Sequence, residues 1–366
     1  MKDDAPISGN TQGDDDMPGS RERRRFLGYG AAGAATALGL PLGLRGTHAL
    51  AQAGASLTIG LLRAPASGIV DLAQQHGWFK EAGVSLSEVL FAAAAGPKII
   101  QALGGGSIGL SFVNSTAALL GLAGGAVPLR FVSIPTDPSR LFAILSNPDI
   151  DSVPKLAGKR VAATGGTALH YFLARVLAKF GMKLADIEFV NLPAAEGQSA
   201  FVAGRVDAIV PSVNGRFYIM NTKKETRELF THPDFTKPPG PTQAFLNYDL
   251  FVTTEDVLKS SRPALHSFLR TYHDKGVRYL LDPKTRDDAI RTITEYVNKE
   301  QKNPTDAAIM NQIITQSGFY DAATTKQLMT RPDFRASLEY QVKFFMDLGQ
   351  IKAAPDLDRH IVTDLL

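Results

Sequence analysis

The segment that most constrains the fold lies between residues 161 and 177, where a strand, a glycine turn and a helix follow one another. The short run 160–163 predicts a buried strand, Gly165 and Gly166 predict a tight turn, and an amphipathic helix is expected to begin near Thr167. A helix start presents N–H groups without partners and about half a positive charge, so an anionic or polar ligand can approach it. The alternative is that this turn closes a βα unit and binds nothing.

The rest of the chain alternates in the same way and forms two series. We expect strands at 57–62, 84–91, 107–113, 129–134, 142–145, 160–163, 188–192 and 206–210. We expect helices at 67–76 with Ser67 as N-cap, 78–83, 96–103, 117–123, 167–181, 195–204, 215–222, 255–281, 285–299, 304–316, 322–328 and 333–348. Such alternation predicts an α/β fold with parallel sheets, whose ligand sites lie at the carboxyl ends of the strands.

Two extended segments, near 140–145 and 243–252, are expected to cross between two lobes. Lobe I would comprise residues 54–142 and 250–366, and lobe II residues 143–249. The first lobe would then contain both the start of the mature chain and the C-terminal helices.

Residues 1–53 differ in character from the rest. A polar, Asp- and Gly-rich start is followed by Arg23-Arg24-Arg25-Phe26-Leu27, a short Gly/Ala/Leu run and the small residues 47–53. A basic segment, a short apolar run and an Ala-x-Ala pattern predict an export signal rather than a membrane span. The twin arginines point to the twin-arginine export machinery, although Glu22 stands where Ser or Thr is usual. We expect cleavage after Ala53, or else after Ala51; a basic disordered tail is the alternative.

Composition excludes several classes of protein. The sequence has no cysteine, so disulfides, thiolate nucleophiles, Cys-bound metals and a lipoprotein anchor are excluded. A net charge of +3 does not favour nucleic-acid binding. The seven histidines are scattered, and neither Gly-x-Ser-x-Gly nor His-Glu-x-x-His occurs. We therefore expect no enzyme, no catalytic residue, no metal and no cofactor.

Four segments in order, 72–84, 100–109, 156–173 and 201–208, carry a family resemblance. The third contains Leu156-Ala-Gly-Lys-Arg-Val161 and Gly166-Thr-Ala-Leu-His-Tyr-Phe-Leu173, and the fourth is Phe201-Val-Ala-Gly-Arg-Val-Asp-Ala208. Together they resemble the nitrate/sulfonate/taurine-type solute-binding proteins of ABC importers. The resemblance implies a two-lobe, type II periplasmic-binding fold with two crossovers. It also implies a periplasmic monomer that closes on a small ligand and docks on an inner-membrane permease.

The sequence departs from the family pattern at two places. Gly109 stands where many relatives have Asp, and residues 211–214 stand where relatives often have Trp-Asp/Glu-Pro-Tyr. Both departures change the expected pocket, so the ligand does not follow from the resemblance.

The expected ligand-binding residues lie in loops that should converge on the cleft: Arg63, Ser67, Asn114, Ser115, Thr116, Gly165, Gly166, Thr167, His170, Ser212 and Asn214. Arg63 can hold an oxyanion as a bidentate fork, or can be an exposed loop cation. Residues 114–116 and His170 can instead serve only as a helix cap and a packed side chain.

These loops contain no acidic residue, which favours a small anionic ligand: an alkanesulfonate, taurine, nitrate or a carboxylate. A neutral or heterocyclic ligand, similar to a vitamin precursor, is the alternative. An enzyme similar to the thiamine-pyrimidine synthases, which share this fold, is disfavoured because those enzymes are cytosolic and use a cysteine-rich motif.

Overall fold

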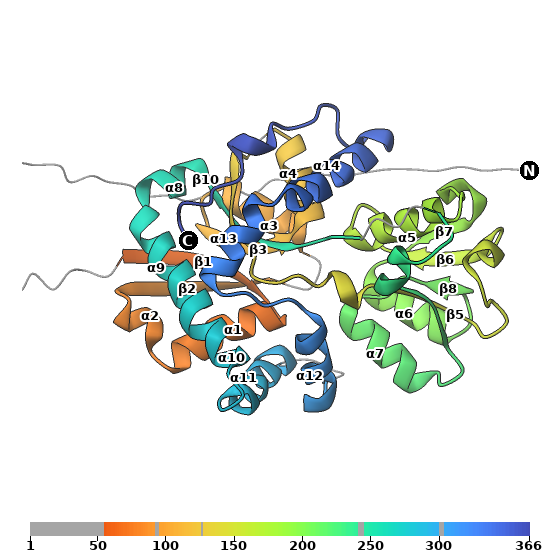
Figure 1. Ribbon diagram of the computed structural model, residues 1–366, viewed down its shortest axis with the longest axis horizontal. Coiled ribbons are helices and arrows are strands. Elements are labelled where there is room, and N and C mark those ends of the chain that lie inside the picture. The colour runs from red at the N-terminus through yellow and green to blue at the C-terminus, as the bar shows by residue number, and fades with distance from the viewer. Residues whose placement is uncertain (1–54, 92–94, 126, 241–244, 300–303) are drawn as a thin grey trace, which may run out of the picture. The chain divides into compact units, whose positions relative to one another are not determined.

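A computed structural model describes residues 55–91, 95–125, 127–240, 245–299 and 304–366 (Figure 1). The predicted export signal and its cleavage site after Ala53 lie outside the described residues. No helix within these ranges is both long and apolar enough to cross a membrane.

The first sheet has the strand order β2-β1-β3-β10-β4. Its strands are β1 (Ala55–Leu62), β2 (Val84–Phe91), β3 (Leu110–Asn114), β4 (Leu129–Ser133) and β10 (Asp249–Thr254). β1 pairs in parallel with β2 and β3, whereas β10 is antiparallel to β3 and β4. The prediction of parallel sheets therefore holds for β1, β2 and β3 and is wrong for β10. β10 enters this sheet after the chain has left the second sheet, so it runs against its neighbours.

The second sheet has the order β7-β6-β8-β5-β9. Its strands are β5 (Ala143–Ser146), β6 (Arg160–Ala163), β7 (Glu188–Asn191), β8 (Ala208–Ile209) and β9 (Arg227–Thr231). Here β5, which the chain reaches from the first sheet, is the strand antiparallel to β8 and β9. Each sheet thus contains one reversed strand next to a crossover. The division into lobes at 142/143 and 249/250 remains a prediction, because the described residues belong to one compact unit.

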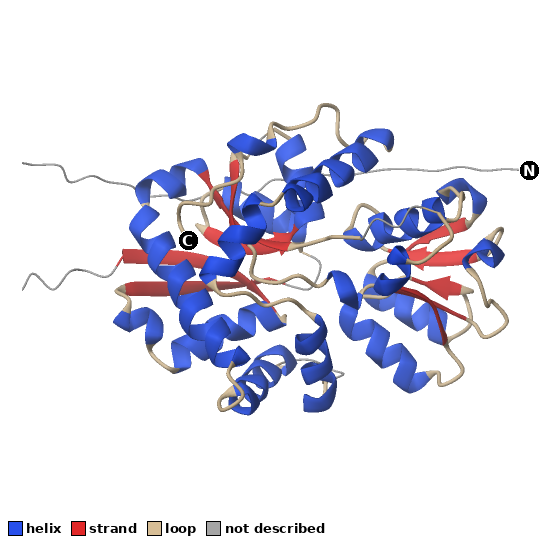
Figure 2. Cartoon of the chain, viewed as in Figure 1, coloured by secondary structure: helices blue, strands red, loops and turns tan. Residues whose placement is uncertain are grey.

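Helices flank both sheets (Figure 2). Between β1 and β4 the chain forms α1 (Pro65–Gln75), α2 (Trp78–Glu81), α3 (Gly96–Gly104) and α4 (Ser115–Ala123). The second sheet carries α5 (Ala168–Lys179), α6 (Ala194–Val202) and α7 (Val213–Thr222). The last third forms α8 (Glu255–Ser260), α9 (Arg262–Arg270), α10 (Arg278–Leu281), α11 (Arg286–Asn298), α12 (Ala307–Gln316), α13 (Ala322–Thr330) and α14 (Pro332–Asp347).

Two helix predictions needed correction. α1 begins at Pro65 with Ala64 as N-cap, so Ser67 does not cap it; proline suits the first helical turn because its missing N–H would have no partner there. The predicted helix 255–281 is divided into α8, α9, a π-helical stretch (Thr271–Val277) and α10, with Pro263 at the start of α9. Short 3₁₀ turns occur at Ser139–Leu141, Val153–Leu156, Leu184–Asp186, His232–Thr236 and Leu357–Arg359.

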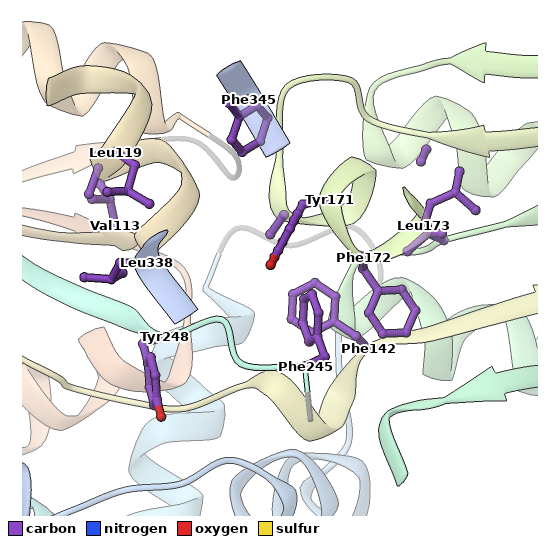
Figure 3. Close-up of a cluster of buried hydrophobic side chains, with 14 of the residues drawn as sticks. Val113, Leu119, Phe142, Tyr171, Phe172, Leu173, Phe245, Tyr248, Leu338 and Phe345 are labelled. Atoms are coloured by element: carbon purple, nitrogen blue, oxygen red, sulfur yellow. The ribbon is translucent and has the colours of Figure 1, made fainter. Parts of the chain in front are cut away.

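One hydrophobic core runs from the first sheet to the second (Figure 3). It joins Leu119 of α4 and Phe172 of α5 to Leu338 and Phe345 of α14, all fully buried. Aromatic rings fill its second-sheet side, where Phe245 of the crossover contacts Phe172 at 5.0 Å between ring centroids. The C-terminal helix α14 therefore packs against helices of both sheets.

Candidate functional site

The glycine turn before α5 is built as the sequence predicted. Thr167 caps the helix: its Oγ1 accepts the N–H of Leu169 at 3.2 Å and donates to the Thr164 carbonyl at 2.6 Å. Gly166 adopts φ +67°, a conformation that favours glycine. The Gly165 N–H donates to Asn191 Oδ1 at 2.8 Å, and a Cβ at Gly165 would lie 2.9–3.0 Å from that amide. Asn191, at the end of β7, belongs to this turn although sequence reasoning had not selected it.

His170 lies inside the first turn of α5 and is buried. Its Nδ1 accepts the Gly166 N–H at 3.3 Å, while its ring stacks on Phe189 at 4.8 Å and meets the edge of Phe344 at 5.7 Å. Burial lowers the pKa of the imidazole, so it is neutral at physiological pH. These contacts give His170 a role in closing the turn and packing α5 on α14.

The start of α4 is occupied by a side chain from α14. Asn114 is the N-cap, and the hydroxyls of Ser115 and Thr116 both donate to Gln341 Oε1, at 3.1 and 2.9 Å. Gln341 is fully buried. Asn247 adds a hydrogen bond to Thr116 Oγ1 at 3.1 Å. The predicted polar cluster therefore exists, but the chain itself supplies an acceptor for its hydroxyl groups.

A carboxyl group that the sequence analysis overlooked lies beside this cluster. Asp249, the first residue of β10, accepts a hydrogen bond from Thr136 Oγ1 at 2.6 Å. Burial raises the pKa of Asp249 to about 6; nearby Asp137 adds to the rise, and hydrogen bonds from Thr136 and Asn114 oppose it. The absence of acidic residues from the predicted loops thus does not extend to the residues that surround α4.

Arg63 and Ser67 lie at the carboxyl end of β1. The Arg63 guanidinium sits over the ring of Tyr296 in α11, 4.7 Å from its centroid. Ser67 is buried, and its Oγ accepts the N–H of Leu62 at 3.1 Å. The Tyr296 hydroxyl donates to the Leu62 carbonyl at 3.2 Å. A cation and a hydroxyl group are therefore held at the end of this strand by α1 and α11.

The last predicted pair follows β8. Ser212 caps α7: its Oγ accepts the Gly215 N–H at 3.2 Å and the side-chain amide of Gln198 at 2.9 Å. Asn214 is exposed. Because β6 and β8 are parallel, Gly165 and Ser212 follow strands that end at the same edge of the second sheet. β1 and β3 are likewise parallel, which places Arg63 and Asn114 at one edge of the first sheet.

A cavity of about 360 Å³ lies between α5 and α14. Its lining residues are Tyr171, Arg175, Leu246, Pro332, Asp333, Ala336, Ser337 and Tyr340. None of them was predicted from the sequence, because α14 is distant along the chain. Across the described ranges, no group of three or more His, Cys, Asp or Glu residues is placed to hold a metal ion.

Comparison with known proteins assigns the family. Residues 65–285, more than half of the 366-residue chain, match the family described as NMT1/THI5 like. The chain belongs to the NMT1/THI5-like family. A provisionally named aliphatic sulfonates-binding protein of Escherichia coli is 34% identical over 116 residues, or 31% of this chain and 36% of that protein. The taurine-binding periplasmic protein of E. coli is 23% identical over 207 residues, or 56% and 60% of the two chains.

The match therefore spans about a third of the first of these relatives and three fifths of the second. Among solved structures, the periplasmic aliphatic sulphonate binding protein SsuA of E. coli superposes with a TM-score of 0.68 at 19% identity, over 84% of this chain and 92% of that one. The desulfurization enzyme DSZB has a TM-score of 0.61 at 13% identity, over 85% and 97%. The predicted α/β periplasmic-binding fold is confirmed, and this NMT1/THI5-like chain shares it with an enzyme as well as with binding proteins.

Proposed function

We propose that the chain is the solute-binding component of an ABC importer and that it captures a small anionic organic ligand by closure of its two lobes. The observation that carries the proposal is topological. Arg63, Asn114, Gly165 and Ser212 follow or end β1, β3, β6 and β8, so the polar loops lie at the carboxyl edges of both sheets. In α/β proteins ligands bind at these edges.

The ligand class rests on the chemistry of these loops. Arg63 supplies a fork-shaped cation, and the Gly165–Thr167 turn supplies the start of α5, whose dipole favours a negative charge. The hydroxyl groups of Ser115 and Thr116 donate to Gln341, and the N–H groups of Gly165 and Gly166 donate to Asn191 and His170. We therefore assign the anion to Arg63, with the positive end of α5 adding to the attraction. An alkanesulfonate or taurine-like ligand agrees with the names of the relatives. Nitrate and carboxylates also present planar, negatively charged oxygen atoms that an arginine can bind.

In this proposal, delivery of the ligand to a permease depends on closure of the two lobes. The two sheets are linked by two crossover segments, between β4 and β5 and between β9 and β10. A ligand that contacts both lobes in the closed form shifts the population towards that form, which an inner-membrane permease can then recognise. The same proposal includes export by the twin-arginine machinery, cleavage after Ala53 and action in the periplasm as a monomer.

The first test is a thermal-shift measurement on the purified protein. The panel contains ethanesulfonate, taurine, nitrate, acetate and, as neutral heterocycles, pyrimidines. A ligand at a hundred times its dissociation constant adds about 2.7 kcal/mol to the free energy of unfolding, a readable shift. We expect a shift with a sulfonate and its reduction in Arg63→Ala and Thr167→Ala. A response only to pyrimidines would replace the anion by a neutral heterocycle, and no response to any compound would contradict the proposal.

Enzymatic desulfurization is the second candidate, because DSZB shares the fold. The chain lacks a cysteine nucleophile, which favours binding over chemistry. Incubation with a sulfonate that binds in the thermal-shift panel, followed by assay for released sulfite, distinguishes the two. We expect no sulfite above the buffer control.

A further inference from the structure

The cavity between α5 and α14 contains an arginine in an aromatic setting. The Arg175 guanidinium lies 5.8 Å from the ring centroid of Tyr171, 5.6 Å from that of Tyr340 and 5.7 Å from that of Phe235. Its Nη1 donates to the Tyr171 hydroxyl at 2.9 Å. Arg175 thus extends from α5 towards α14, where Tyr340 lies on the opposite wall.

The described charged side chains at this cavity leave one positive charge, that of Arg175, without a neighbouring carboxylate. Asp333 is the other charged lining residue, and it forms an ion pair with Arg331, with Nη2 and Oδ2 2.5 Å apart. Among the described residues, no carboxylate lies within ion-pair distance of Arg175. One positive charge in a partly enclosed cavity favours an anion.

The Tyr171 hydroxyl supplies a second polar group. It is almost fully buried, and burial raises its pKa, so the phenol stays protonated. Since the oxygen accepts a hydrogen bond from Arg175, its own proton is available to an acceptor in the cavity. Figure 3 shows the hydroxyl pointing away from Phe345, which packs behind the ring.

Most of the remaining wall is apolar, and the Ser337 hydroxyl, also in the lining, donates to the Phe334 carbonyl. Leu246, Pro332 and Ala336 carry no polar side-chain atom, and the rings of Tyr171 and Tyr340 are the aromatic faces. The volume of about 360 Å³ lies in the range of small-molecule sites, roughly 300–1,000 Å³. Such walls suit a planar hydrophobic body, because aromatic pairs add to the gain from burial alone.

We propose that this cavity binds an aromatic carboxylate or sulfonate, with Arg175 and Tyr171 holding the oxyanion and Tyr340 packing on the ring. This inference rests on the proposed function and assigns it a ligand class and a site on α5 and α14. Arg63 and the α5 turn would then bind smaller anions, or contact the ligand only when the two lobes have closed. The cavity, rather than those loops, discriminates aromatic from aliphatic ligands.

Isothermal titration calorimetry of the full chain tests the proposal with four probes. Benzenesulfonate has the full chemistry, cyclohexanesulfonate lacks the aromatic ring, ethanesulfonate lacks the ring-sized body, and benzyl alcohol lacks the charge. We expect benzenesulfonate to bind most tightly. Arg175→Gln should weaken it about ten- to hundredfold, the effect of losing a charge-assisted hydrogen bond.

Two further variants make the result specific. Arg205→Gln removes an exposed arginine of the same charge outside the cavity and should leave binding unchanged. Tyr340→Ala should weaken benzenesulfonate about two- to tenfold. Because Tyr340 is 44% exposed, this variant tests the site even if Arg175→Gln fails to fold.

The outcomes separate the inference from the proposed function. Benzenesulfonate binding that Arg175→Gln or Tyr340→Ala weakens, and Arg205→Gln does not, supports the inference. Binding of ethanesulfonate without benzenesulfonate would overturn the inference and leave the proposed function intact. Benzenesulfonate binding that neither cavity variant changes would also overturn it. No binding of any of the four probes would overturn the inference, and the thermal-shift panel with taurine, nitrate and acetate would then decide the proposed function.

Discussion

Asp249 shows how one buried side chain makes stability depend on pH. Its pKa is raised to about 6 in the folded protein, mainly by burial, from an ordinary value of 3.8. The protonated form is therefore favoured by folding. The contribution of protonated Asp249 to the free energy of unfolding is complete below about pH 4 and is lost as the pH rises through about 6.

We expect Asp249→Asn to remove this dependence, because asparagine keeps a polar side chain of similar size without the charge. Relative to the native protein, the variant should gain up to about 3 kcal/mol of unfolding free energy between pH 4 and pH 7. Urea denaturation of both proteins across that range measures the difference. A difference that does not vary with pH would show that Asp249 ionises as freely as an exposed carboxyl group.

Helix starts were predictable where the residues that form them lie next to one another in the sequence. The turn before α5 needed two glycines and a capping threonine within four residues, and the structure has that turn. The start of α4 was predictable as a cap, but its partner Gln341 lies 225 residues beyond Thr116. No local pattern marks a glutamine on α14 as the acceptor for α4, so packing between distant helices decides which group bonds to the start of α4. The cavity beside Arg175 was missed for the same reason.

The bond from α14 to α4 predicts a stability effect. In Gln341→Ala the hydroxyls of Ser115 and Thr116 lose their acceptor in a buried position, where an unsatisfied polar group costs about 1–3 kcal/mol. We expect the free energy of unfolding to fall by at least that amount, since a void is also created. The matched control is Gln312→Ala on an exposed position of α12, for which we expect a change within about 0.5 kcal/mol. Equal losses in the two variants would argue against a special role of Gln341.

At the scale of the whole molecule, the alternation of strands and helices and the two crossovers were readable from the sequence. The reversed strands β5 and β10 were not, because strand direction depends on which sheet the chain returns from rather than on the residues of the strand. That topology has a mechanical consequence. The connection from β4 to β5 contains the 3₁₀ turn Ser139–Leu141, and the connection from β9 to β10 contains the 3₁₀ turn His232–Thr236. A few residues in such connections can absorb a hinge rotation.

Hinge closure can be measured directly because the sequence has no cysteine, so two introduced cysteines would be the only labelling sites. Gln75 at the end of α1 and Lys224 after α7 are exposed positions on the first-sheet and second-sheet sides. With spin labels at both, we expect the distance distribution to shift to shorter values when a calorimetrically verified ligand is added. A pair on one side, Gln75 and Gln312, should keep its distribution and serves as the control. If the first pair also stays unchanged while ligand is bound, the proposed closure of the two lobes on the ligand is wrong.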